Sequence, residues 1–141
     1  MDVIAIAQIN LVFQVVILTV LVTGFILKRR HKLFPHGTTM LIAVVLNAIS
    51  IFLVMGPSLL GRLQSIQESP FGSFSVAIVG HAALGSVTEL LGVWIVGSWH
   101  LQSSTQGCAA KRKIMRFTLA LWITTILLGF LLYAYISGLI S

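Results

Sequence analysis

The stretch HGTTMLIAVVLNAISIFLVMGPSLL, residues 36–60, contains no Asp, Glu, Lys or Arg. A helix needs about 20 predominantly apolar residues, at about 1.5 Å of rise each, to cross a hydrocarbon core of about 30 Å. The stretch is therefore long enough and apolar enough to be a transmembrane helix. It also carries His36 at its start and Asn47 near its middle, and polar groups at these depths require partners.

Similar apolar runs occur at 4–27, 74–99 and 114–138, and we place the span of the quoted stretch at 37–60. Hydrophobic residues make up 57% of the 141-residue chain and charged residues 9%, whereas about 25% charged residues is usual in a soluble domain. We therefore predict an all-α membrane protein. Because the connectors are short, consecutive spans are expected to be antiparallel neighbours. The prediction is one domain, residues 1–141, folded as an antiparallel bundle of four transmembrane helices.

The basic residues are concentrated in two connectors. The sequences KRRHK at 28–32 and KRK at 111–113, together with Arg116, contain eight of the nine Lys and Arg residues. Cytoplasmic loops of membrane proteins collect Lys and Arg, so we predict that both connectors are cytoplasmic and that both termini lie outside. The net charge of +6 is then a topology signal of a multi-pass cell-membrane protein in contact with the lipid bilayer. We expect no nucleic-acid partner.

Each predicted span carries a stripe of small and polar residues. At 100° per residue, one line along the second span contains His36, Met40, Ala43, Asn47, Ser50 and Val54. The other spans have comparable stripes: Asn10, Gln14 and Gly24; then His81, Gly85, Thr88, Gly92 and Trp99, with Glu89 at the edge; then Thr118, Thr125 and Gly129. Lipid solvates apolar side chains as well as another helix does, so we expect the four stripes to face one another.

The histidines occupy different predicted depths. His36 and His100 are expected at the inner interface, whereas His81 lies about seven residues below the outer one, level with Asn10 and Met55. At about 1.5 Å per residue, His36 and His81 are about 25 Å apart along the membrane normal, so they cannot bind one metal ion. His36 and His100 either contact head groups and cap helices or ligate haem or a metal. His81 is either a packing residue or an axial haem ligand.

Asn47 and Glu89 are predicted to meet near the midplane of the membrane, where an ionisable residue is costly. Glu89 either ties two helices together by a hydrogen bond to Asn47 or Thr88, or it handles protons or contacts a substrate. Met40 is either a core filler or a soft ligand on the same stripe as His36.

Several chemical classes lack their sequence signals. The chain has no HExxH, CxxC or CxxCH sequence and no glycine-rich phosphate loop. These absences argue against zinc proteases, dithiol redox proteins, c-type cytochromes and nucleotide-binding proteins. No nucleophile is paired with a base, so we do not expect an enzyme. Cys108 is the single cysteine, which excludes a disulfide within one chain.

Three motifs together resemble a family of small four-helix bacterial and archaeal membrane proteins of unknown function that includes CtaM-type proteins. They are HGTTML at 36–41, HAALG at 81–85 and KRKIMRFTLALWITTILLGFLLY at 111–133, and the resemblance covers most of residues 25–135. It implies a role in the maturation of haem-copper cytochrome oxidases through the handling of haem or copper. The positions that match the family pattern are His36, Met40, His81, Trp122, Gly129 and Tyr133.

One position departs from the pattern of that family. Members often carry a further histidine in the basic stretch before the fourth span, where this chain has Lys111. If that histidine acts as a ligand or proton donor in the family, His100 would have to replace it here.

These features leave three classes of function. The first is an integral membrane accessory or assembly protein linked to a respiratory haem-copper oxidase, with haem binding as one way of acting. Its partner would be the terminal oxidase, another membrane complex or a second copy of the chain. The second is a small b-type cytochrome in which His81, or His36 with His100, ligates haem b. The third is a minimal transporter or proton path that uses Glu89, although four spans without a repeat offer little material for alternating access.

Overall fold

A computed structural model describes residues 3–102 and 111–139 of the chain, with side chains for 4–99 and 111–139. Its helices, in order, are α1 (Val3–Arg29), α2 (Leu33–Ser50), η1 (Ile51–Met55), α3 (Gly56–Leu60), α4 (Leu63–Glu68), α5 (Ser73–Gln102) and α7 (Arg112–Ile136). No strand occurs within these described ranges. The prediction of an all-helical chain is therefore confirmed for them.

Four helical segments are long and apolar enough to cross a membrane: Ile4–Arg29, Leu33–Leu60, Ser73–Trp99 and Arg112–Ile136. They match the predicted spans to within a few residues. The second segment begins earlier than expected and has Pro35 in its first turn. A proline is tolerated there because the first backbone N–H groups of a helix have no partner within the helix.

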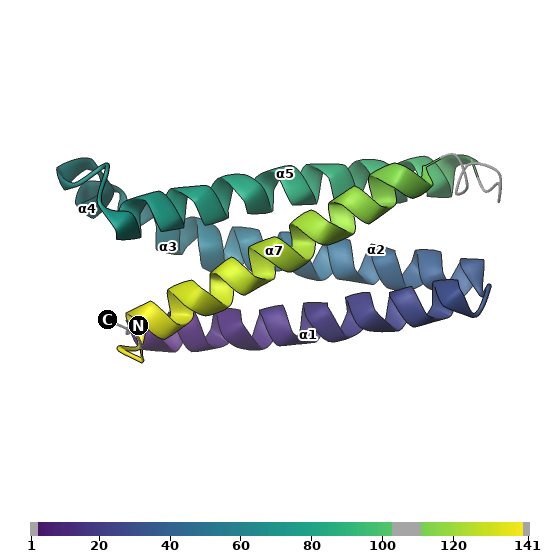
Figure 1. Cartoon of the computed structure of the whole chain (residues 1–141), viewed down its shortest axis with the longest axis horizontal. Coiled ribbons are helices and arrows are strands. Elements are labelled where there is room, and N and C mark those ends of the chain that lie inside the picture. Colours follow the sequence, from purple (N-terminus) through teal and green to yellow (C-terminus); the bar gives the residue numbers. More distant parts are fainter. Residues whose placement is uncertain (1–2, 103–110, 140–141) are drawn as a thin grey trace.

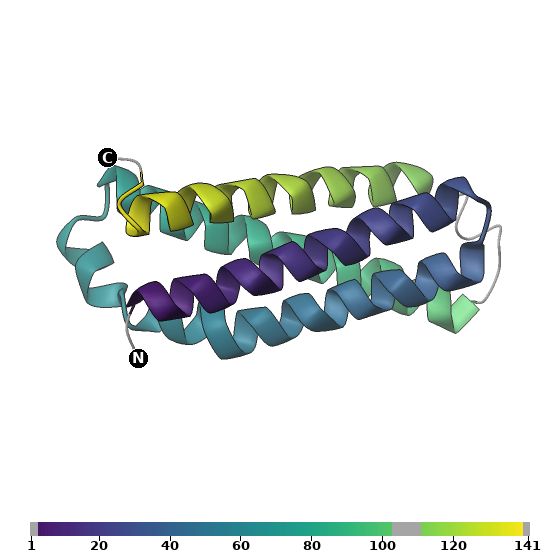
Figure 2. The same ribbon diagram turned by 90° about the horizontal axis from the view of Figure 1, so that it is seen from below.

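The long helices lie side by side along the molecule (Figures 1 and 2). The chain runs from the end that holds both termini to the opposite end in α1, returns through α2, η1 and α3, and repeats this course with α5 and α7. Direct contacts join α1 to α2, α2 to α5, α5 to α7 and α7 to α1. Each long helix thus packs against two others, and together they enclose an interior.

The end of the second span contains a wide π-helical turn, η1, where the sequence indicates a kink or an end at Gly56 and Pro57. The Gly56 N–H donates to the carbonyl of Ile51, five residues back. Pro57 has no N–H to donate and its ring would collide with the carbonyl of Leu53 in a regular α-helix. The wider turn gives that ring space, so the helix continues through α3 to Leu60.

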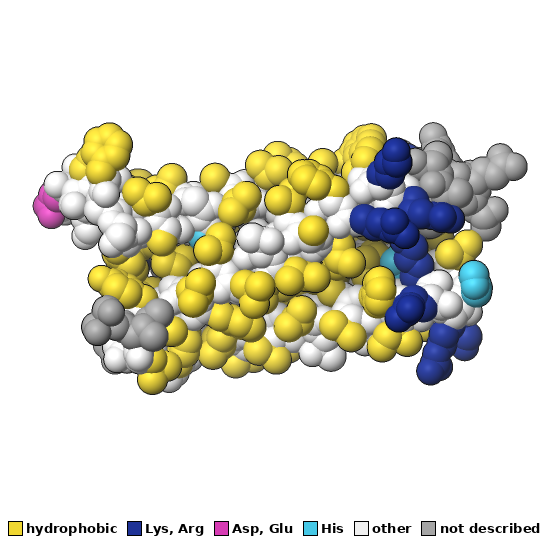
Figure 3. All heavy atoms as spheres, viewed as in Figure 1, with side chains coloured by type: hydrophobic (Ala, Val, Ile, Leu, Met, Phe, Trp, Pro, Cys, Tyr) yellow, Lys and Arg dark blue, Asp and Glu magenta, His cyan; other side chains and the backbone are white. Residues whose placement is uncertain are grey.

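Polar side chains are buried in the interior beside an apolar core, and large apolar side chains cover the exterior. The buried polar side chains that belong to the predicted stripes are Gln14, Asn47, Ser50, His81, Thr88, Thr118 and Thr125; Ser75, outside these stripes, is also buried. Large apolar side chains such as Phe52 and Leu90, 77% and 71% exposed, point outward. Apolar atoms cover the length of the visible face in Figure 3, and Lys and Arg gather at one end. The expectation that the four stripes face inward is confirmed for these residues.

Two buried glycines allow close packing between helices. A Cβ atom added at Gly37 of α2 would collide with the ring of Trp99 on α5, and one at Gly24 of α1 would collide with the methyl group of Met40 on α2. Small residues at helix interfaces have this role in membrane proteins, because association depends on close van der Waals contact.

We predict that Gly37→Ala destabilises the bundle and that the matched change Gly97→Ala does not. An added methyl group at Gly37 forces the Trp99 ring to move, at a cost of about 1–3 kcal/mol for overpacking. Gly97 is exposed and has no neighbouring atom within 4 Å of an added Cβ, so alanine there is neutral or slightly stabilising. Unfolding by SDS in mixed micelles measures both variants. Equal stability of the two would contradict the close packing at Gly37.

Candidate functional site

A cavity of about 670 Å³ lies between the long helices at the end where the basic residues gather. We call it the large cavity. Its walls are mainly apolar, and its charged lining residues are Lys28, Arg29, Arg112 and Arg116. Sites for cofactors and drug-sized ligands measure roughly 300–1,000 Å³ and combine apolar walls with a few polar groups. The large cavity therefore has the size and lining of a ligand site for an anionic amphiphile.

His36 is held in the wall of the large cavity. Its Nδ1–H donates to the backbone carbonyl of Gly24 on α1 over 2.8 Å, since a carbonyl can only accept. In the neutral imidazole this hydrogen bond places the proton on Nδ1 and leaves Nε2 free to accept a hydrogen bond or to bind a metal. Histidines that ligate metals commonly donate their second ring nitrogen to a backbone carbonyl in this way. His36 is thus oriented as a ligand, although the bond also explains it as a tie between α1 and α2.

Two thioethers also line the large cavity. Met40 lies one turn beyond His36 on α2, and Met115 belongs to α7. Together with His36 they provide the soft nitrogen and sulfur ligands that suit haem iron or copper. The donor set and the cationic residues, which can receive propionates, fit haem b. His100 belongs to α5, but its side chain lies outside the described residues, so the expected pairing of His36 with His100 stays a prediction.

Two buried hydrogen-bonding groups in the wall of the large cavity have no partner among the described residues. They are the Thr118 hydroxyl and the Trp122 indole N–H, both on α7. Leaving such a group unpaired costs about 1–3 kcal/mol, and both atoms are buried beside the cavity and not exposed to it. The sequence predicted Thr118 as a stripe residue and Trp122 as part of the family pattern, but neither as part of a site. The sequence feature that could have identified them is their spacing of four residues, which places both on one helix face.

Asn47 and Glu89 meet in the interior, as the helix stripes predict. The Asn47 amide Nδ2 donates to Glu89 Oε2 over 2.8 Å. The second carboxylate oxygen, Oε1, is buried and has no partner within the described part of the chain. The Thr88 hydroxyl donates to the Leu84 carbonyl of its own helix and does not serve Glu89. Asn47 therefore supplies the bond that joins α2 to α5 at this depth.

Asn10 forms the corresponding link between α1 and α2. The Ser50 hydroxyl donates to Asn10 Oδ1 over 3.1 Å. Ser50 is fully buried at the end of α2, immediately before η1. This pair lies beside a second cavity, because Asn10 also lines it.

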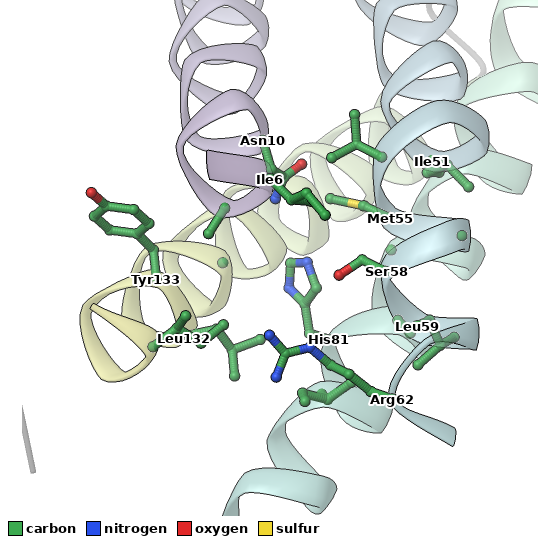
Figure 4. Close-up of a pocket in the computed structure, with 18 of the residues that line it drawn as sticks. Ile6, Asn10, Ile51, Met55, Ser58, Leu59, Arg62, His81, Leu132 and Tyr133 are labelled. Atoms are coloured by element: carbon green, nitrogen blue, oxygen red, sulfur yellow. The ribbon is translucent and has the colours of Figure 1, made fainter. Parts of the chain in front are cut away.

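The second cavity, which we call the small cavity, measures about 190 Å³ and lies near the end that holds both termini. His81 on α5 lines it (Figure 4). The backbone carbonyl of Thr125 lies beside the ring, but His81 Nδ1 has no hydrogen-bond partner among the described residues. A Cβ atom added at Gly129 would lie 3.2 Å from His81 Cε1, so this glycine on α7 makes room for the ring.

His36 and His81 thus line separate cavities near opposite ends of the molecule. This separation agrees with the prediction that they do not share a metal ion. Within the described ranges, no three side chains of His, Cys, Asp or Glu come together as metal ligands.

Comparison of the chain with known protein families, with characterised proteins and with solved structures finds no match.

We predict that Asn47→Leu destabilises the bundle by about 1–3 kcal/mol, because it leaves the Glu89 carboxylate without its hydrogen bond. A double-mutant cycle with Glu89→Leu isolates the pair, and a coupling energy of about 0.5–2 kcal/mol is expected. The measurement is unfolding by SDS in mixed micelles for the parent, both single variants and the double variant. Additive effects, with a coupling energy near zero, would show that the bond does not hold α2 and α5 together.

Proposed function

We propose that the protein is an integral membrane accessory protein that binds haem b in the large cavity and serves the maturation of a respiratory haem-copper oxidase. The observation that carries this proposal is the convergence, in one cavity of about 670 Å³, of an oriented imidazole, two thioethers and four cationic side chains. Haem needs these three elements: axial ligands for the iron, apolar walls for the ring and cations for the propionates.

The residues of this chain would divide the binding of haem among them. His36 Nε2 would ligate the iron, since its Nδ1–H is held by the Gly24 carbonyl. Arg112 and Arg116 at the start of α7 would pair with the propionates, and Lys28 and Arg29 supply further positive charge. Bound haem supplies a redox-active iron, and the apolar walls of the cavity would limit the access of water to it.

The topology is part of the proposal. We propose an antiparallel four-span bundle in the cell membrane, with the basic end in the cytoplasm and both termini outside. The concentration of Lys and Arg at one end supports this orientation by the positive-inside rule. The large cavity would then receive its ligand at the cytoplasmic face.

The link to an oxidase rests on the resemblance to the family that includes CtaM-type proteins. A terminal oxidase, or another membrane complex, would be the partner that receives haem, and contact would occur through the lipid-facing apolar surface. The resemblance also implies the handling of haem or copper, and the soft ligands His36, Met40 and Met115 of the large cavity suit either.

A small b-type cytochrome is the second candidate, favoured by one specific observation. Met115 lies on α7 and His36 on α2, yet both line the large cavity. Side chains from two helices could then both hold haem, which would suit a permanent electron-transfer centre. Met40 cannot replace Met115 in this role, because it follows His36 on the same helix face. A transporter that uses Glu89 has less support, since the Asn47 bond gives this carboxylate a structural role.

We predict that purified protein in mild detergent binds one equivalent of haemin with a shifted Soret band. His36→Leu is expected to remove the shift, whereas His81→Leu at the small cavity is expected to retain it. Arg112→Gln and Arg116→Gln should each weaken binding about ten-fold to a hundred-fold, because each loses a charge-assisted hydrogen bond of about 1.5–3 kcal/mol. Spectrophotometric titration measures the affinities.

Arg30→Gln is the matched control for these variants. Arg30 is exposed at the same end but does not line the large cavity. The Arg30→Gln variant should therefore bind haemin with the same affinity as the parent. Met115→Leu separates the two candidates, since only a cytochrome with two axial ligands loses a low-spin spectrum in that variant. Loss of the Soret shift in His81→Leu, with His36→Leu unchanged and both variants folded, would contradict the assignment of haem to the large cavity.

A further inference from the structure

The small cavity contains a polar group that the proposed haem site does not use. His81 is 9% exposed, and its Nδ1 has no hydrogen-bond partner among the described residues. In Figure 4 the imidazole projects into the middle of the cavity, with the Ser58 hydroxyl and the Arg62 guanidinium turned toward it. An imidazole can either donate or accept a hydrogen bond, so this ring could serve a polar ligand in the cavity beside the backbone of Thr125, which also contacts it.

Arg62 brings a positive charge to the same cavity. Its guanidinium lies over the ring of Phe74, with 5.5 Å from Cζ to the ring centroid. Among the residues that the structure describes, no carboxylate pairs with Arg62; the Glu68 carboxylate instead accepts from Gln64. The N–H groups of Arg62 are therefore available to an oxygen atom in the cavity.

Asn10 adds a further donor. Its Oδ1 already accepts from Ser50, which leaves the Nδ2 hydrogens to donate. The remaining lining is largely apolar and includes Ile51, Met55 and Leu132. The small cavity thus combines apolar walls with donors from α1, α5 and the turn after α3.

The backbone of the second span helps to form this space. The wide turn η1 contributes Ile51 and Met55 to the lining, and Gly56 follows directly. On the opposite side, Gly129 leaves room for the His81 ring. π-Helical turns occur frequently at functional sites, and this one borders the cavity that holds the unpaired imidazole.

We propose that the small cavity binds the oxygen-bearing head group of a membrane amphiphile, either a quinone or a fatty-acid carboxylate. Both ligands present oxygen atoms to Arg62 and His81 and an apolar body to the walls. At about 190 Å³ and partly open, the cavity is smaller than the roughly 300 Å³ of typical sites for whole ligands, so only the head group enters and the chain of the amphiphile stays outside. This proposal is independent of haem, because the two cavities share no lining residue.

The experiment measures equilibrium binding of ubiquinone-1 and of laurate to the full-length protein in nanodiscs, by calorimetry, with empty nanodiscs as the blank. The variants are Arg62→Gln and His81→Leu, and Arg30→Gln is the matched control for loss of a cation. Arg62 is half-buried and contacts one aromatic ring, so its variant should fold even if His81→Leu does not. The melting temperature of each variant is recorded first.

We expect at least one probe to bind saturably, with affinity reduced about ten-fold or more in Arg62→Gln and in His81→Leu and unchanged in Arg30→Gln. Binding of ubiquinone-1 alone identifies a quinone site, and binding of laurate alone identifies a carboxylate site. Saturable binding to neither probe, or affinities that Arg62→Gln leaves unchanged, would overturn the proposal. If His81→Leu folds and keeps the parent affinity, the proposal is overturned as well.

Discussion

A bilayer offers no hydrogen bonds to a polar side chain, and this constraint determines how the helices of this protein face one another. Each long helix satisfies its own backbone groups, so the polar stripe residues bond either to their own helix, as Thr88 does, or to a neighbouring helix. Asn47 reaches Glu89 over 2.8 Å and Ser50 reaches Asn10 over 3.1 Å. These bonds connect α2 to α5 and to α1, and the apolar faces are left for lipid.

The same constraint makes the two cavities informative. Between them the interior is closely packed, with Ile17, Ser50, Thr88 and Ile126 fully buried. Toward each end the helices leave space. Of the four buried polar atoms without partners among the described residues, three belong to residues that line these cavities, Thr118 and Trp122 at the large one and His81 at the small one; the fourth, Glu89 Oε1, lies at neither. A bundle that needed only to pack would not leave such atoms unpaired. The two cavities are therefore the places where we propose that ligands bind.

The sequence predicts the spans and the inward-facing stripes well, because helix length and a period of 3.6 residues are local properties. It also predicts that Asn47 and Glu89 meet, since both lie at the same depth. It does not predict the bond from His36 to Gly24, the wide turn η1 or the entry of Arg62 into a cavity. These features depend on the spacing and rotation of neighbouring helices and on side-chain conformation, which a periodic pattern does not encode.

The function that we propose depends on haem being held in the large cavity through His36. The most direct measurement is a pyridine haemochrome assay on the parent protein, purified in mild detergent from haem-replete cells and shown to be folded and monodisperse. The account predicts haem b close to one equivalent per chain. A colourless protein, with no haemochrome signal under these conditions, would contradict it.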